Sequence, residues 1–135
     1  MLTLMRIIFL ILLVVLVAFY AWFTVRGDNR LSSVAFLPRP PMVFFDLNPL
    51  ARNFPAFAVL GVLLAAVVVG LGPKWQVLSL ALCLAAPVLK DIAQIPLVGR
   101  HFNWTAVGLG LLGAVIGWLL CWAAGRWLVE RMGYP

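Results

Sequence analysis

Residues 7–25 form a run without a single charged side chain. A helix rises about 1.5 Å per residue, so this run is about long enough to cross the roughly 30 Å hydrocarbon core of a bilayer. Hydrophobic residues make up 65% of the 135 positions and charged residues only 10%, with a mean hydropathy of +1.11. Soluble domains are about half apolar and a quarter charged. The chain is therefore predicted to be an integral membrane protein.

Three further apolar runs follow along the chain. None alternates polar and apolar residues as a barrel strand does, and a segment within lipid must satisfy its own backbone hydrogen bonds, so each run is predicted to be a helix. We expect an all-α integral membrane protein with one membrane domain and four transmembrane helices. These helices are expected at residues 7–25, 54–71, 75–95 and 104–124, with an interfacial loop at 26–53 and a short tail at 125–135.

Local signals set these boundaries. The second run opens at Pro55, which the first helical turn tolerates, and it closes at Gly72 and Pro73. So short a link to the third run predicts an antiparallel helical hairpin. The third run is predicted to bend near Pro87. The first run is predicted to stay as an anchor, because bulky residues follow it where a signal peptidase needs small ones.

The third predicted helix carries polar residues one to two turns inside the membrane boundary. Lys90, Asp91 and Gln94, with His101 nearby, form a possible intramembrane polar site, because ionisable groups at that depth are costly and often functional. The favoured interpretation is anchoring. Lys90 would extend toward the headgroups, and Asp91 would pair with Lys90 or with Arg100.

The connection at residues 26–53 combines four prolines with many apolar residues. The prolines exclude a continuous helix and predict extended or polyproline II backbone around residues 37–41. Extended backbone cannot lie exposed in hydrocarbon, and the apolar side chains do not belong in water. The segment is expected to lie at the headgroup interface or on another protein. The predicted contact residues are Phe36, Pro38, Arg39, Pro41, Phe44 and Phe45.

Small residues recur every four positions on the fourth predicted helix. A weaker version of the pattern marks the second helix, and such faces allow two helix backbones to approach closely. The neighbour is expected to be a helix of the same chain, although a partner's helix stays an alternative. The predicted packing residues are Gly113, Gly117, Cys121, Gly125, Gly61 and Ala65.

Trp118 and Trp122 lie one turn apart, away from that small-residue face. A buried indole N–H needs a hydrogen-bond partner, so these residues are predicted to contact a lipid, a quinone or pigment, or another subunit. Core packing is an equally open alternative.

The residues that could take part in catalysis or metal binding are one histidine, two cysteines and four acids. Their spacing is not typical of a catalytic or metal site. A haem held by two histidines of this chain is excluded, whereas a single ligand at His101 stays open. Cys83 and Cys121 are interpreted as packing residues. We expect no enzymatic activity, no metal, and no cofactor beyond a bound lipid, quinone or pigment.

The formal net charge is +6 and the pI is about 10.4. The charges are scattered over helix ends and form no basic stripe, so nucleic acid is not an expected partner and anionic lipid is. The first and third connections between the predicted helices lie on one side of the membrane, and they hold more Lys and Arg residues than the connection and the termini on the other side. This difference mildly favours both termini outside the cytoplasm. Compact size and the lack of sorting signals favour a bacterial inner membrane.

The order of one helix, a Pro-bearing connection and a Gly-rich second helix resembles small envelope proteins of the lipopolysaccharide-assembly type. Four short spans are similar to the small subunits of tripartite transporters. No specific motif carries either resemblance, so neither assigns a role to any residue. The predicted function is a non-catalytic subunit that packs on and stabilises a larger respiratory, photosynthetic or transport complex. The alternative is a small oligomeric transporter or channel, or a transporter's small subunit, with Lys90, Asp91 and Gln94 near the path.

Overall fold

The computed structural model describes residues 2–25, 36, 38–48, 50–98 and 102–133. The described residues form five helices and no strand. Three of these helices, α1, α4 and α5, are long and apolar enough to cross a membrane, which indicates a membrane protein with several spans. The helices are α1 (Leu2–Val25), α2 (Arg39–Leu47), α3 (Asn53–Val68), α4 (Pro73–Val98) and α5 (Trp104–Arg131).

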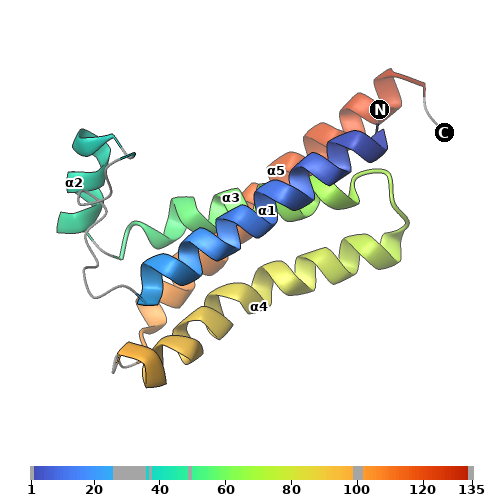
Figure 1. Ribbon diagram of the computed structural model, residues 1–135. Coiled ribbons are helices and arrows are strands. Elements are labelled where there is room, and N and C mark those ends of the chain that lie inside the picture. The colour runs from blue at the N-terminus through green and yellow to red at the C-terminus, as the bar shows by residue number, and fades with distance from the viewer. Residues whose placement is uncertain (1, 26–35, 37, 49, 99–101, 134–135) are drawn as a thin grey trace.

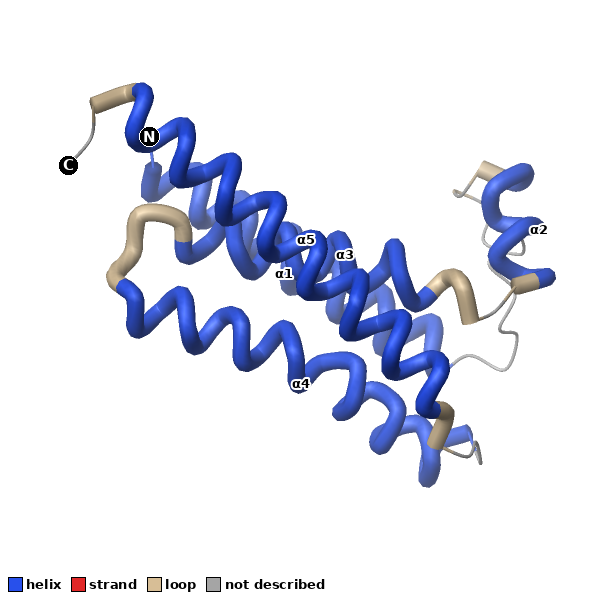
Figure 2. Tube along the Cα trace, turned by 180° about the vertical axis from the view of Figure 1, so that it is seen from behind, coloured by secondary structure: helices blue, strands red, loops and turns tan. Residues whose placement is uncertain are grey.

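The four longer helices run lengthwise beside one another, and α2 lies apart at one end of them (Figure 1). We call this end the α2 end: α1 and α4 finish there, and α3 and α5 begin there. The start of α1 and the end of α5 lie at the opposite end, which we call the terminal end. The reverse view shows the same arrangement (Figure 2).

The helix bounds differ from the expected ones. The expected second span, residues 54–71, ends earlier as α3, and the chain then turns at Gly70, whose φ of 77° favours glycine. The expected tail is largely helical, because α5 continues to Arg131. Apolar residues persist there, and Arg126 pairs with Glu130 one turn later at 3.4 Å, which supports the helix.

The prediction of extended backbone around residues 37–41 was wrong for most of that stretch. Pro38 is extended, with φ −65° and ψ 126°, but α2 begins immediately after it. Pro40 and Pro41 occupy the first helical turn, where a missing backbone donor costs nothing and the fixed φ already suits a helix. The prolines therefore start this helix rather than prevent it.

The core lies mainly between α3 and α5, the pair of helices with the most extensive contact. It is built from small and aromatic side chains, which allows the helices to approach closely. Its buried members are Phe57, Ala65, Cys83, Ala114 and Trp118.

Candidate functional site

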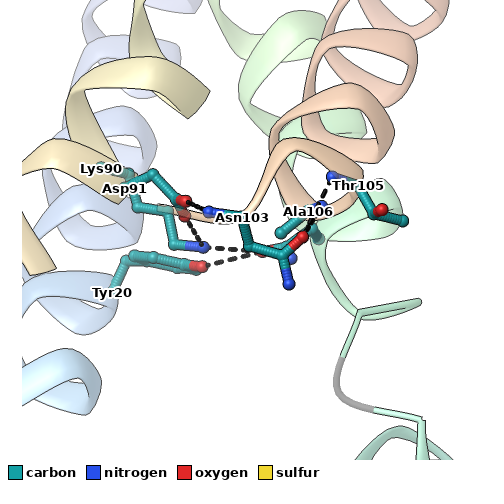
Figure 3. Close-up of polar contacts among 7 residues, drawn as sticks. Tyr20, Lys90, Asp91, Asn103, Thr105 and Ala106 are labelled. Atoms are coloured by element: carbon teal, nitrogen blue, oxygen red, sulfur yellow. Dashed lines mark hydrogen bonds and ion pairs between the residues drawn. The ribbon is translucent and has the colours of Figure 1, made fainter. Parts of the chain in front are cut away.

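A cluster of polar side chains joins three helices near the α2 end (Figure 3). The Nζ atom of Lys90 on α4 donates to Oδ1 of Asn53 at 3.1 Å and lies 3.3 Å from Oδ1 of Asp91. The hydroxyl of Tyr20 on α1 donates to the same Asn53 oxygen at 3.5 Å. The Lys90 side chain is 15% exposed and is directed toward Asn53 at the start of α3.

The second oxygen of Asp91 holds the start of α5. It accepts the backbone N–H of Asn103 at 2.8 Å. The Asn103 side chain in turn caps α5 by accepting the N–H groups of Thr105 at 3.0 Å and Ala106 at 3.2 Å. Asp91 is only 6% exposed, and a charge at that burial needs the compensation that Lys90 supplies. The geometry is that of a clasp between α4 and α5.

The predicted intramembrane polar site is therefore assembled only in part. Lys90 and Asp91 contact each other, and Gln94 is buried on the same helix, 9% exposed. His101 and Arg100 lie outside the described residues. The cluster instead draws on Tyr20 and Asn53, which the sequence analysis did not select. The role of Asn103 could have been predicted from the sequence, because asparagine directly before an apolar run is a preferred helix cap.

The two deep tryptophans contact α4. The Trp118 indole N–H donates to Ser79 Oγ at 2.9 Å, and that of Trp122 donates to Gln76 Oε1 at 3.2 Å. The two rings stack with centroids 5.9 Å apart. Trp118 is 5% exposed. Trp118 therefore packs in the core, the alternative that the sequence analysis left open, and Ser79 supplies the partner for its N–H.

The small-residue face of α5 lies on α3. A Cβ atom at Gly113 or Gly117 would overlap the main-chain oxygen of Phe54 or Ala58, and one at Gly61 would overlap the α5 backbone in the same way. The neighbour of this face is thus a helix of the same chain. The remaining predicted packing residues lie at the same interface or beside the core: Ala65 is fully buried, Cys121 packs against the core, and a Cβ at Gly125 would lie 2.7 Å from the Val69 side chain.

The predicted contact residues of the connection lie on or beside α2. Phe44 is 56% exposed and Phe36 is 71% exposed, with the Phe36 ring 5.9 Å from that of Phe19 on α1. Pro38 and Pro41 are also exposed, while the side chains of Arg39 and Phe45 lie outside the described part of the structure. Within the described residues, α2 packs against none of the other four helices.

Among the described residues, no group of three or more His, Cys, Asp or Glu side chains is placed to hold a metal ion. Comparisons of the chain with protein-family models, with curated proteins and with solved structures found no match. The function is therefore argued from geometry.

Proposed function

We propose that this chain is a non-catalytic small subunit that packs on a larger membrane protein complex and stabilises it. The observation that carries the proposal is the exposed apolar face of α2. Val43 is 46% exposed, Phe44 56% and Leu47 77%, on a helix that packs against no other described helix. A group of exposed apolar side chains marks a contact surface for a lipid or a protein.

The position of α2 favours a protein at that surface. The helix lies beyond the end of the bundle, where α1 stops and α3 and α5 start (Figure 1). Hydrocarbon covers the sides of a bundle, whereas a helix past its end meets the headgroup layer or another subunit. Beside α2, an apolar hollow of about 820 Å³ lies between Phe44, Leu47 and the start of α3. A partner side chain inserted there would be removed from water.

The exposed surface of α1 gives independent support. No residue of its central span is buried within the bundle, and its side chains are aliphatic on nearly every side. Helix faces of this kind lie against lipid or against an equally apolar partner. Since α2 is the next helix in the chain, α1 is proposed to extend the contact surface along the membrane.

The transporter or channel alternative has less support. A conducting path needs polar groups that face water along its length. Here the charges of Lys90 and Asp91 compensate each other in the clasp, and the close approach at Gly113 and Gly117 leaves no room between α3 and α5. Flux through proteoliposomes that disappears in Asp91→Asn would reverse this ranking.

We also propose that α3 is a fourth span, in a bacterial inner membrane as predicted from the sequence. At about 1.5 Å per residue its 16 residues reach about 24 Å, less than the hydrocarbon thickness. Three neighbours shield it, since α1, α4 and α5 all contact α3. At the terminal end, Arg6 donates to the Val69 carbonyl at 2.9 Å, which satisfies a backbone group just past the helix.

Purification of a tagged chain in mild detergent tests the subunit proposal. We expect other membrane proteins to elute with it in a fixed ratio, and Phe44→Ala with Leu47→Ala to reduce their recovery. The matched control is Leu82→Ala with Leu120→Ala, which removes similarly exposed side chains from α4 and α5. A chain that always elutes alone and monodisperse contradicts the proposal, as does an equal loss of partners in the control.

A further inference from the structure

A pocket of about 290 Å³ lies at the terminal end, where α3 ends, α4 begins and α5 ends (Figure 2). Residues of the turn after α3, of α4 and of α5 line it, among them Val69, Gln76, Trp122, Arg126 and Glu130. The volume is well above that of a single water molecule. The pocket thus brings a cation, an anion and an aromatic ring together on one surface.

The pocket lies at the edge of the hydrocarbon layer. Arg126 is about 13 Å from the middle of α5 along the helix, and Gln76 is about 14 Å from the middle of α4, at about 1.5 Å per residue. With both helices centred in the bilayer, these distances match the half-thickness of the hydrocarbon core, about 15 Å. Trp127, 53% exposed, fits the same level, because tryptophan gathers at the membrane interface. The pocket is therefore at the level of lipid headgroups.

Hydrogen bonds and ring contacts fix the inner side of the pocket. The Nε2 atom of Gln76 donates to the Leu71 carbonyl at 3.2 Å, and its Oε1 atom accepts the Trp122 N–H at 3.2 Å. The Arg126 guanidinium lies over the Trp122 ring, with Cζ 5.2 Å from the ring centroid. This cation–π contact holds the positive charge at the pocket.

The two charged residues of the pocket are paired with each other only loosely. Arg126 donates one hydrogen bond to Oε1 of Glu130 at 3.4 Å, and the side chains are 61% and 68% exposed. So exposed a pair contributes little to stability. A guanidinium has several N–H donors and a carboxylate has several acceptor positions, so both groups can contact a ligand while they stay paired.

A ligand that carries both a negative and a positive group matches this pair. A purely anionic headgroup would meet the charge of Glu130. The headgroup of phosphatidylethanolamine offers a phosphate to the guanidinium and a primary ammonium, with N–H donors, to the carboxylate. The quaternary ammonium of phosphatidylcholine has no N–H donor, and the Trp122 ring that could bind it already contacts Arg126 and stacks on Trp118.

We propose that this pocket binds the headgroup of phosphatidylethanolamine, with the phosphate at Arg126 and the ammonium at Glu130. Val69 and Val129, which also line the pocket, give the glycerol and the start of the acyl chains apolar surroundings. The site lies at the opposite end of the bundle from α2, so it does not depend on the proposed partner surface.

The experiment uses the purified full-length chain without a partner, in nanodiscs that contain equal amounts of phosphatidylethanolamine, phosphatidylglycerol and phosphatidylcholine. Native mass spectrometry then counts the lipids retained after the disc is removed. We expect one tightly held phosphatidylethanolamine, at about a threefold excess over each of the other two lipids, as one exposed ion pair would give. Water-soluble glycerophosphoethanolamine should not displace it, because it lacks the acyl chains.

Two variants separate the roles of the charges. Arg126→Gln should lose most of the retained lipid of every kind, because the phosphate contact is gone. Glu130→Gln should retain lipid without the excess of phosphatidylethanolamine, and Glu130→Asp, which keeps the carboxylate, should keep the excess. All these side chains are exposed, so helical circular dichroism should not change.

Arg131→Gln is the matched control. Arg131 also lies over a tryptophan ring at the end of α5, with Cζ 4.4 Å from the centroid of Trp127, but it does not line the pocket. The variant removes the same charge as Arg126→Gln and should retain as much lipid as wild type.

The proposal is overturned if wild-type protein retains the three lipids equally or prefers phosphatidylglycerol, or if Glu130→Gln keeps the excess. It is also overturned if Arg131→Gln loses as much lipid as Arg126→Gln, or if glycerophosphoethanolamine displaces the lipid. Because no partner is present, failure of this test leaves the subunit proposal standing, and the copurification result has no bearing on lipid retention.

Discussion

The indole nitrogen of Trp118 lies 2.9 Å from the hydroxyl oxygen of Ser79, and this hydrogen bond joins α5 to α4 inside the core. Both side chains are nearly fully buried, with 5% and 3% of their surfaces exposed. A buried indole without a partner would cost free energy, so Ser79 permits a tryptophan at this position.

A double-mutant cycle of Trp118→Phe and Ser79→Ala measures this bond. We expect a coupling free energy of about 0.6 kcal/mol and at most about 1.7 kcal/mol, the range typical of hydrogen bonds between membrane helices. Equilibrium unfolding in mixed micelles gives the value. Trp127→Phe, at a side chain 53% exposed, is the control for loss of an indole. A coupling of zero would show that the bond does not form.

Two glycines of α5 should respond to alanine with opposite signs. Gly117→Ala places a methyl group against the Ala58 carbonyl on α3 and should destabilise the fold by about 1–3 kcal/mol. Gly108→Ala meets no atom within 4 Å and should stabilise the helix by about 0.5–1 kcal/mol. Both values come from unfolding in mixed micelles. Equal effects at the two positions would rule out the close approach of α3 and α5.

Asp91 should act as a structural clasp. Asp91→Ala removes the carboxylate that lies beside the Lys90 ammonium, 15% exposed, and the acceptor of the Asn103 N–H, so stability should fall by about 3 kcal/mol. Removal of both charges in Lys90→Met with Asp91→Leu should recover part of that loss, because no uncompensated charge remains. Thermal unfolding measures both variants. A double variant less stable than Asp91→Ala would contradict the clasp.

Thiol labelling tests whether α3 crosses the membrane. Leu50→Cys lies just before α3 and Gly72→Cys just after it, and neither replaces a buried side chain. If α3 is a span, a membrane-impermeant thiol reagent labels the two cysteines from opposite sides of the membrane. The parent chain is the control, because its native Cys83 and Cys121 lie inside long apolar helices. Labelling from one side only would reduce the number of spans to three.

The membrane class and the long helices followed from hydrophobic length alone, which needs no tertiary information. The uncharged run at residues 7–25 forms most of α1, and the one at residues 104–124 forms the first three quarters of α5. The boundaries were harder to predict, because apolarity does not state where hydrogen bonding of the backbone stops. Prolines misled the prediction for α2, since the same residue that breaks a helix interior also suits its first turn.

The hydrogen-bond partners of the buried polar side chains were the hardest feature to predict. Lys90 and Asp91 are adjacent in sequence, so their pairing could be considered in advance. Tyr20 and Asn53 join them from helices far away along the chain, and only the packing of α1 and α3 brings them there. The same applies to Trp118, whose partner Ser79 lies 39 positions away in the sequence.

The most direct test of the subunit proposal is site-specific photocrosslinking in intact membranes. A photoreactive amino acid at Phe44 on α2 should yield an adduct with one protein of defined mass, and the same residue at Leu120 on α5, which is 66% exposed, should yield lipid adducts only. A chain that gives no protein adduct at position 44, while Leu120 reacts with lipid as expected, would contradict the proposal that α2 is held by a larger complex.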